Sequence, residues 1–237
     1  TFTLKASRWP ILFILYEQLW GISMVIIIGG DLVPTEVNIK YFINGDLNRL
    51  MGSELSEIWF NADYRIFNLE TPLSDHESPI LKQGPNLIAP SETINGINKL
   101  KPTLVTLANN HILDHGEIGL KNTLRLLEKS KINYIGAGKN IYEAKKPYIL
   151  KQDNKSVGIY ACAEHEFSIA GIESPGANPF DPLESLDHIV ELKNKCDYVI
   201  VIYHGGKEHY RYPSPYLQKV CRKMIDKGAD IVICQHS

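Results

Sequence analysis

The chain has 237 residues and 44% hydrophobic content, which is enough apolar material for one sizeable core and predicts a single large α/β domain. Its 25 Lys and Arg residues against 27 Asp and Glu residues leave a net charge of -2, so no global basic field favours nucleic acid as a partner. The four cysteines are irregularly spaced and form no Cys-x-x-Cys pair, which favours core positions over disulfides or a zinc site.

The first 23 residues form an N-terminal extension of uncertain nature. Their apolar run from Ile11 to Leu15 is interrupted by Glu17 and Gln18, and so falls short of the roughly 18 apolar residues of a spanning helix. The small-residue cleavage site of a signal peptide is also missing. These features favour a cytoplasmic location, with membrane association as the alternative, and predict that the folded domain covers residues 24–237.

From Met24 onward, β-rich apolar runs alternate with helical patterns, as in a layered α/β domain. The apolar runs predict strands at Val25 to Ile28, Tyr64 to Asn68, Leu104 to Leu107, Asn133 to Ile135, Tyr148 to Lys151, Val157 to Cys162, Tyr198 to Tyr203 and Ile231 to Cys234. The helical patterns predict helices at Glu54 to Asn61, Glu92 to Leu100, Glu117 to Ser130, Leu183 to Lys193 and Pro215 to Lys227. Asp153 and Asn154 between two strands predict a hairpin, which makes the sheet mixed.

The best-defined helix is the last one. Ser214 can cap it, Pro215 suits its first turn and Gly228 can end it. Its apolar stripe has helical spacing and is expected to face the core. The segment from Glu164 to Pro182 is rich in Gly and Pro and predicts a long loop, of the kind that often carries specificity.

Side chains that can bind metal follow several of the predicted strands directly. They are Asp31, Glu70, the Asn109-Asn110-His111 triplet, His204 and His236. Open α/β folds collect their ligands at strand ends, so these residues are expected to share one sheet edge. Mixed oxygen and nitrogen donors suit Mn, Fe, Zn or similar divalent ions. Two such ions bridged by a carboxylate can activate a water.

Each of these residues, taken alone, also fits a structural role. Asp31 can shape a turn after its two glycines, Glu70 can cap a loop, and Asn109 and Asn110 can occupy strained turn positions. His204 is more informative, because the glycines after it let a ligand approach closely. The joint pattern favours the functional interpretation.

The segment after His204 crowds polar donors into one short stretch. Lys207, Glu208, His209, Arg211 and Tyr212 are therefore candidates for binding an anionic substrate, with a solvated surface loop as the alternative. The remaining histidines are expected in loops or at the surface, apart from His188, which falls on a predicted helix.

Separated motifs resemble the CapA family from about Met24 to the end of the chain. They are Gly30-Asp31, Asn68-Leu69-Glu70-Thr71-Pro72, Ala108-Asn109-Asn110-His111 with Asp114 and Gly116, His204-Gly205-Gly206-Lys207-Glu208, and Gly228-Ala229-Asp230 before Gln235-His236. CapA proteins are named for poly-γ-glutamate capsule synthesis in bacteria. They are similar to calcineurin-like metallophosphatases, so the resemblance implies a layered β-sandwich flanked by helices.

The resemblance also implies a role for each matching residue. Asp31 would bind one metal, Glu70 would bridge two, and Asn110 with His204 would bind the second. His111 would donate a proton or stabilise the transition state, and Asp114 could hold its ring by a hydrogen bond. His236 would be the first histidine of a terminal His-x-His pair.

The chain departs from the wider superfamily in three ways. The first motif lacks a histidine at Val33, and a glutamate, Glu70, stands where the bridging aspartate is expected. The chain also stops at Ser237, before the second histidine of the terminal pair, which leads us to expect a domain that is incomplete at its C-terminus.

Three functions fit these observations. The first is a metal-dependent hydrolase-type domain in poly-γ-glutamate synthesis or export, with two divalent ions and membrane proteins of capsule synthesis as partners. The second is a phosphoesterase acting on a small phosphorylated metabolite. The third is a non-catalytic component that binds the polymer or assists assembly. The expected substrate is anionic in the first two, a polyglutamate or a phosphoester.

Overall fold

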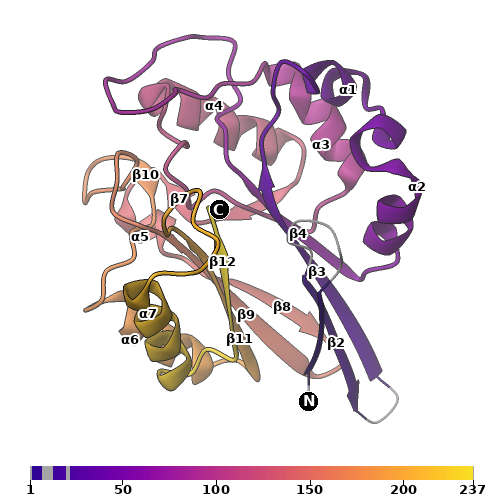
Figure 1. Ribbon diagram of the computed structural model, residues 1–237, viewed down its shortest axis with the longest axis vertical. Helices are drawn as coiled ribbons and strands as arrows, with labels where there is room; N and C mark the ends of the chain where they lie inside the picture. Colours follow the sequence, from indigo (N-terminus) through magenta and orange to yellow (C-terminus); the bar gives the residue numbers. More distant parts are fainter. Residues whose placement is uncertain (1, 7–12, 20–21, 237) are drawn as a thin grey trace. The chain divides into compact units, whose positions relative to one another are not determined.

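The computed structural model describes residues 2–6, 13–19 and 22–236, with side chains described from Met24 onward. The described chain forms two compact units (Figure 1). The first unit contains the residues up to 106 together with 111–134, and the second contains 107–110 together with the residues from 135.

The first unit is built on a six-stranded sheet with the strand order β1-β2-β3-β4-β5-β6. Its strands are β1 (Phe2–Ala6), β2 (Phe13–Leu19), β3 (Ile22–Leu32), β4 (Tyr64–Leu69), β5 (Leu104–Thr106) and β6 (Asn133–Ile135). β3, β4 and β5 pair in parallel, whereas β1 and β2 extend the sheet in antiparallel fashion. The end of β4 is buried continuously, as expected for a parallel strand covered on both faces.

The helices of the first unit are α1 (Ile39–Asn44), α2 (Leu47–Phe60), η1 (Ser91–Thr93), α3 (Ile94–Leu100) and α4 (Gly116–Lys129). Figure 1 shows α1, α2 and α3 grouped together. The indole N–H of Trp59 in α2 donates a 2.7 Å hydrogen bond to the carbonyl oxygen of Leu100, which ties α2 to the end of α3. Gly96 of α3 packs directly on the backbone of Phe42 in α1.

The second unit contains a four-stranded sheet with the order β12-β11-β9-β8. Its strands are β8 (Tyr148–Gln152), β9 (Lys155–Ala163), β11 (Tyr198–His204) and β12 (Ile231–Gln235), and a two-stranded sheet pairs β7 (Ala137–Gly138) with β10 (Gly176–Ala177). Only β8 runs antiparallel in the larger sheet. Asp153 and Asn154 have φ angles of 48° and 64°, the left-handed values that a tight hairpin turn requires.

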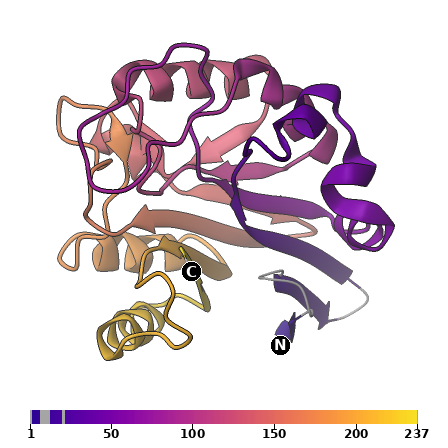
Figure 2. The same ribbon diagram turned by 45° about the horizontal axis from the view of Figure 1, so that its top comes forward.

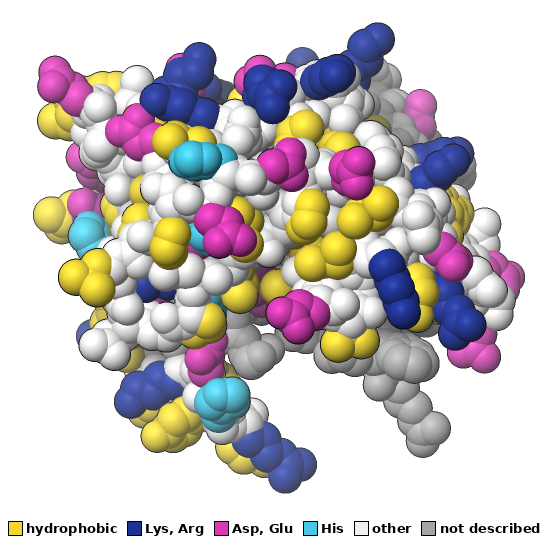
Figure 3. Space-filling model, turned by 90° about the horizontal axis from the view of Figure 1, so that it is seen from above, with side chains coloured by type: hydrophobic (Ala, Val, Ile, Leu, Met, Phe, Trp, Pro, Cys, Tyr) yellow, Lys and Arg dark blue, Asp and Glu magenta, His cyan; other side chains and the backbone are white. Residues whose placement is uncertain are grey.

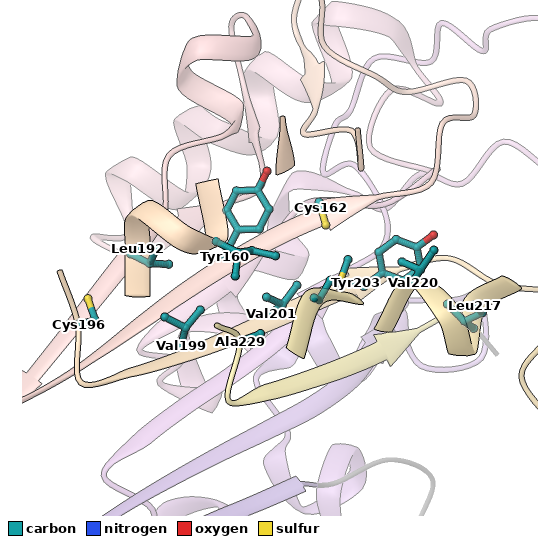
Figure 4. Close-up of a cluster of buried hydrophobic side chains, with 12 residues drawn as sticks. Tyr160, Cys162, Leu192, Cys196, Val199, Val201, Tyr203, Leu217, Val220 and Ala229 are labelled. Atoms are coloured by element: carbon teal, nitrogen blue, oxygen red, sulfur yellow. The ribbon is translucent and has the colours of Figure 1, made fainter. Parts of the chain in front are cut away.

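Helices α6 (Ser185–Lys193) and α7 (Pro215–Asp226) lie side by side against this sheet, and α5 (Ile141–Ala144) lies beside β7 (Figure 2). Figure 4 shows the core between these helices and the strands, with Tyr160 from β9, Val201 and Tyr203 from β11 and Val220 from α7. All four free cysteines lie in or against this core, as their sequence context predicts.

The α/β fold class and the mixed sheet are confirmed, and every strand and helix predicted from the sequence is present. β3 starts at Ile22 and α2 at Leu47, which is earlier than predicted. Among the helices of the described residues, none is long and apolar enough to cross a membrane. The face in Figure 3 carries basic and acidic side chains together, in keeping with a net charge of -2.

Candidate metal centre

In the first unit, a ladder of polar side chains fixes the Asp31 carboxylate. The strand register pairs Asp31 of β3 with Asn68 of β4, and Asn68 with Thr106 of β5. The Asn68 amide donates a 2.7 Å hydrogen bond to Asp31 Oδ1, and the Thr106 hydroxyl donates to Asn68 Oδ1 over 3.4 Å. Asn68 and Thr106 are fully buried, so the carboxylate is held by groups that cannot exchange their hydrogen bonds with bulk water.

Glu70 follows β4 directly and is 8% exposed. Its backbone N–H donates a 3.2 Å hydrogen bond to the carbonyl oxygen of Leu32, which keeps the ends of β3 and β4 together. The register and this hydrogen bond therefore bring Asp31 and Glu70 to the same edge of the sheet, at the ends of neighbouring parallel strands.

His111 and Asp114, also in the first unit, form a buried pair. His111 Nδ1 lies 2.6 Å from Asp114 Oδ2, the contact that their spacing predicts. Asp114 is fully buried, and its Oδ2 also accepts a 2.6 Å hydrogen bond from the backbone N–H of Leu87. A third member, Lys82, carries no signal in the sequence, and its ammonium group lies 2.5 Å from Asp114 Oδ1.

In the second unit, Asn110, His204 and His236 come together. His204 ends β11, is 2% exposed, and has its Nε2 3.0 Å from Asn110 Oδ1. The ring of His236, which follows β12, lies edge-on to the His204 ring with centroids 4.8 Å apart. The backbone of Asn109 accepts a 2.6 Å hydrogen bond from the buried Ser168 hydroxyl, which anchors the segment that carries Asn110.

These three side chains fit a divalent ion. Neighbouring ligands of an octahedral ion, with bonds of about 2.1 Å, lie ~3 Å apart, which is the separation of Asn110 Oδ1 and His204 Nε2. His204 and His236 can each offer a ring nitrogen within 4.8 Å of the other. Two imidazoles and an amide oxygen suit Mn, Fe or Zn better than Ca, which prefers oxygen ligands alone.

The two glycines after His204 allow the backbone to pack closely against the side chain of Glu164. A Cβ on Gly205 would lie 2.5 Å from Cγ of Glu164, and the N–H of Gly206 donates a 3.0 Å hydrogen bond to Glu164 Oε2. The Tyr203 hydroxyl donates to the other carboxylate oxygen over 3.0 Å, and burial, with the Glu164 charge beside it, raises the pKa of Tyr203. Glu164, which the sequence did not single out, therefore sets the path of the chain leaving His204.

A pocket of about 460 Å³ in the second unit adjoins His236. Among the predicted substrate residues, Lys207, Arg211 and Tyr212 line it, together with Arg222 from α7. Lys207 and Arg211 each lie over a tyrosine ring, at 5.5 Å from Tyr210 and 5.8 Å from Tyr212. The cationic side chains give this pocket the character of an anion-binding site.

The two other predicted substrate residues are not among the residues lining that pocket. Glu208 has its Oε1 3.8 Å from His236 Nε2, and His209 is exposed with a φ of 65°. His115 lies in a turn directly before α4, within the expectation of a loop or surface position, but its side chain is buried. His115 is 4% exposed, and its Nδ1 accepts a 2.8 Å hydrogen bond from the backbone N–H of Ser78. It is a structural histidine.

Solved structures with the same fold include phosphatases. A hypothetical protein from Thermus thermophilus aligns with a TM-score of 0.51 at 18% identity, covering 88% of this chain and 66% of its own. A phosphatase of Mycoplasma pneumoniae has a TM-score of 0.50 at 14% identity, covering 89% and 63%. A putative 5'-nucleotidase of Staphylococcus aureus has a TM-score of 0.50 at 18% identity, covering 81% and 39%. These similarities confirm the metallophosphatase-like fold.

Sequence relatives carry capsule-synthesis names. The capsule biosynthesis protein CapA of Bacillus anthracis is 31% identical over 218 residues, which cover 87% of this chain and 52% of that protein. The PGA biosynthesis protein CapA of Bacillus subtilis is 30% identical over 182 residues, covering 74% and 47%. The chain thus spans about half the length of these relatives. Residues 25–237 match the family of the bacterial capsule synthesis protein PGA_cap, and the chain belongs to that family.

Proposed function

We propose that this chain is a divalent-metal-dependent hydrolase domain of the phosphoesterase type that acts in poly-γ-glutamate capsule synthesis or export. The observation that carries the proposal is the pairing of Asn110 with the buried His204, whose side-chain donor atoms are 3.0 Å apart, next to the ring of His236. Both Bacillus relatives are named for biosynthesis of capsule or PGA, which supports the biological setting. Membrane proteins of capsule synthesis are the partners we propose.

Two divalent ions, of Mn, Fe, Zn or a similar metal, are the proposed cofactors. Their ligands would be Asp31, Glu70, Asn110, His204 and His236, with Glu70 bridging the two ions. When bound, such ions supply Lewis-acid polarisation and lower the pKa of a water molecule. Asn68 orients Asp31 through its hydrogen bond, and the segment held by Ser168 presents Asn110.

His111 and Asp114 are the proposed proton-transfer pair. The Nδ1–H of His111 donates to Asp114 Oδ2, because a carboxylate 2.6 Å away can only accept. Proton exchange with a leaving group then takes place at Nε2. Asp114 holds the ring in that orientation, as a carboxylate does for a catalytic histidine in many hydrolases.

The pocket beside His236 is the proposed site for the anionic group of the substrate. Lys207 and Arg211 would pair with its charge, and Tyr212 would form its wall. Glu208 and His209 would contribute from the exposed edge of the same loop. A phosphorylated metabolite is the second candidate substrate, and the phosphatase fold of the solved neighbours favours it.

Metal analysis of the purified chain, followed by a screen of phosphoesters and γ-glutamyl amides, tests the proposal. We expect bound divalent metal and metal-dependent turnover in at least one of the two substrate classes. His204→Ala should lose both, whereas His165→Ala, at an exposed loop histidine, should lose neither. Full metal loading without turnover of any substrate would favour a non-catalytic polymer-binding component instead.

A further inference from the structure

The loop between β4 and η1 exposes a leucine and buries the lysine next to it. Leu81 is 103% exposed, whereas the side chain of Lys82 is 2% exposed. Solvation favours the opposite arrangement, since burying an ammonium group is strongly unfavourable unless the group is paired. Lys82 is therefore kept buried by its interactions with its partners. In this loop conformation Leu81 points into solvent and its side chain is not buried.

Both residues proposed for proton transfer are partners of Lys82. Its Nζ lies 2.5 Å from Asp114 Oδ1 and 3.2 Å from His111 Nδ1. The contact with Asp114 is an ion pair by distance rather than a directional hydrogen bond. Asp114 is fully buried, and the ammonium group of Lys82 is a cation that balances its charge inside the unit.

The donor and acceptor chemistry decides how Lys82 acts on His111. An ammonium only donates and an ionised carboxylate only accepts. His111 Nδ1 is closer to the carboxylate, at 2.6 Å, so it carries a proton and cannot also accept one from Lys82. Lys82 therefore acts on His111 through Asp114, by fixing and neutralising the carboxylate that orients the ring.

We propose that Lys82 is a positioning residue for the proposed hydrolysis: it pairs with the buried Asp114 carboxylate and so holds the His111 ring with Nδ1 on Asp114 and Nε2 directed away from it. The inference rests on the proposed function only for the role of His111. The geometry of the three side chains stands independently of the substrate.

Three variants test it: Lys82→Met, Lys82→Arg and the control Lys121→Met, which removes an exposed lysine paired with Glu117. One measurement is the ring ¹⁵N spectrum of His111 in the metal-free chain. The other is kcat and KM for p-nitrophenyl phosphate in the metal-loaded chain. Lys82→Met should lose the slowly exchanging Nδ1 proton signal and lower kcat roughly tenfold or more, with KM little changed. Lys82→Arg should restore both, and Lys121→Met should change neither.

A Lys82→Met chain that keeps the Nδ1 signal and kcat, and loses only thermal stability, would overturn the proposal and leave Lys82 as a structural counter-ion. Because the single variant buries an unpaired carboxylate, its Tm should fall by roughly 10 °C. The double variant Lys82→Met with Asp114→Asn should regain most of that loss, and no recovery would contradict the charge balance. Absence of turnover in the unmodified chain would count against the proposed function alone, because the ring spectrum still decides the role of Lys82.

Discussion

Glu70 is the residue whose replacement distinguishes a bridged pair of ions from separate ions. Glu70→Gln keeps the shape of this 8% exposed side chain but removes its charge. If Glu70 bridges the two ions, both should be lost together in this variant. The metal content, measured by inductively coupled plasma mass spectrometry, should then fall from about two ions per chain to well below one. The control Glu117→Gln changes an exposed carboxylate on α4 and should have no effect. Loss of a single ion would show that Glu70 serves one metal only.

His111 should act in chemistry rather than in metal binding, because its Nδ1 is already bonded to Asp114. His111→Ala is expected to leave metal content unchanged while turnover falls roughly a hundredfold or more, the usual effect of losing an acid–base group. Metal analysis and turnover of the same preparation check this prediction. A variant that loses its metal would make His111 a ligand.

Cys221 is the thiol expected to react at neutral pH. Its Sγ lies 3.4 Å from that of Cys234, and the hydrogen bond from Cys234 stabilises the thiolate and lowers the pKa of Cys221 to about 7. A lowered pKa means that the thiolate is already formed above about pH 7, so alkylation by iodoacetamide should level off there. Burial raises the pKa of Cys162, which should stay unlabelled in the folded chain.

Peptide mass spectrometry across a pH series measures this labelling. In Cys234→Ala the hydrogen bond is gone, and labelling of Cys221 should rise up to about pH 8.5, as for an ordinary thiol. Labelling that follows the same pH curve in both chains would show that Cys234 does not affect Cys221.

At the scale of elements, the contact between α1 and α3 depends on a glycine. A Cβ on Gly96 would lie 2.6 Å from the Cα of Phe42 and 2.7 Å from its carbonyl oxygen. Both are backbone atoms of α1, so relieving the clash would require the whole helix to shift. Gly96→Ala gains about 1 kcal/mol of helix propensity but incurs roughly 1–3 kcal/mol of overpacking. We expect net destabilisation in urea unfolding, whereas Lys99→Ala, at an exposed position of α3, should be nearly neutral. A Gly96→Ala chain of increased stability would show that the helices separate easily.

Elements with local signals could be predicted from the sequence. α7 begins where predicted because Ser214 Oγ accepts a hydrogen bond from the N–H of Leu217 and Pro215 occupies the first turn. The hairpin is present because Asp153 and Asn154 tolerate positive φ. By contrast, α1 has six residues and no side-chain cap, and β7 and β10 have two residues each, too few to show any periodicity. The strands β7 and β10 pair with each other, and α1 packs on α3, so each of these elements depends on residues far away in the chain.

At the scale of the whole molecule, the same distinction separates the predicted site residues from the missed ones. Asp31, Glu70 and His204 could be predicted because each follows an apolar strand, and strand ends converge on sheet edges. Lys82 and Glu164 lie in loops, where no pattern indicates which side chain points inward. Apolar side chains are usually buried and charged ones exposed, but here the charged Lys82 is buried and the apolar Leu81 next to it is exposed. Loop residues of this kind become visible only when their buried partners are known.

The proposed ligands are distributed over both units, and metal removal tests this distribution. Asp31 and Glu70 belong to the first unit, and Asn110, His204 and His236 to the second. Metal at about 100 times its dissociation constant should stabilise the chain by about 2.7 kcal/mol, which corresponds to roughly 5–10 °C in Tm for a chain of this size. EDTA should reverse that shift.

Hydrogen exchange of the metal-free and metal-loaded chains then shows which ligands bind. We expect added metal to protect the ends of β3 and β4 in the first unit as well as the ends of β11 and β12 in the second, because ligand binding suppresses local opening at each ligating segment. The hairpin at Asp153 and Asn154 has no proposed ligand and is the internal reference. Protection confined to β11 and β12 would remove Asp31 and Glu70 from the ligand set and leave a centre built from Asn110 and the histidines alone.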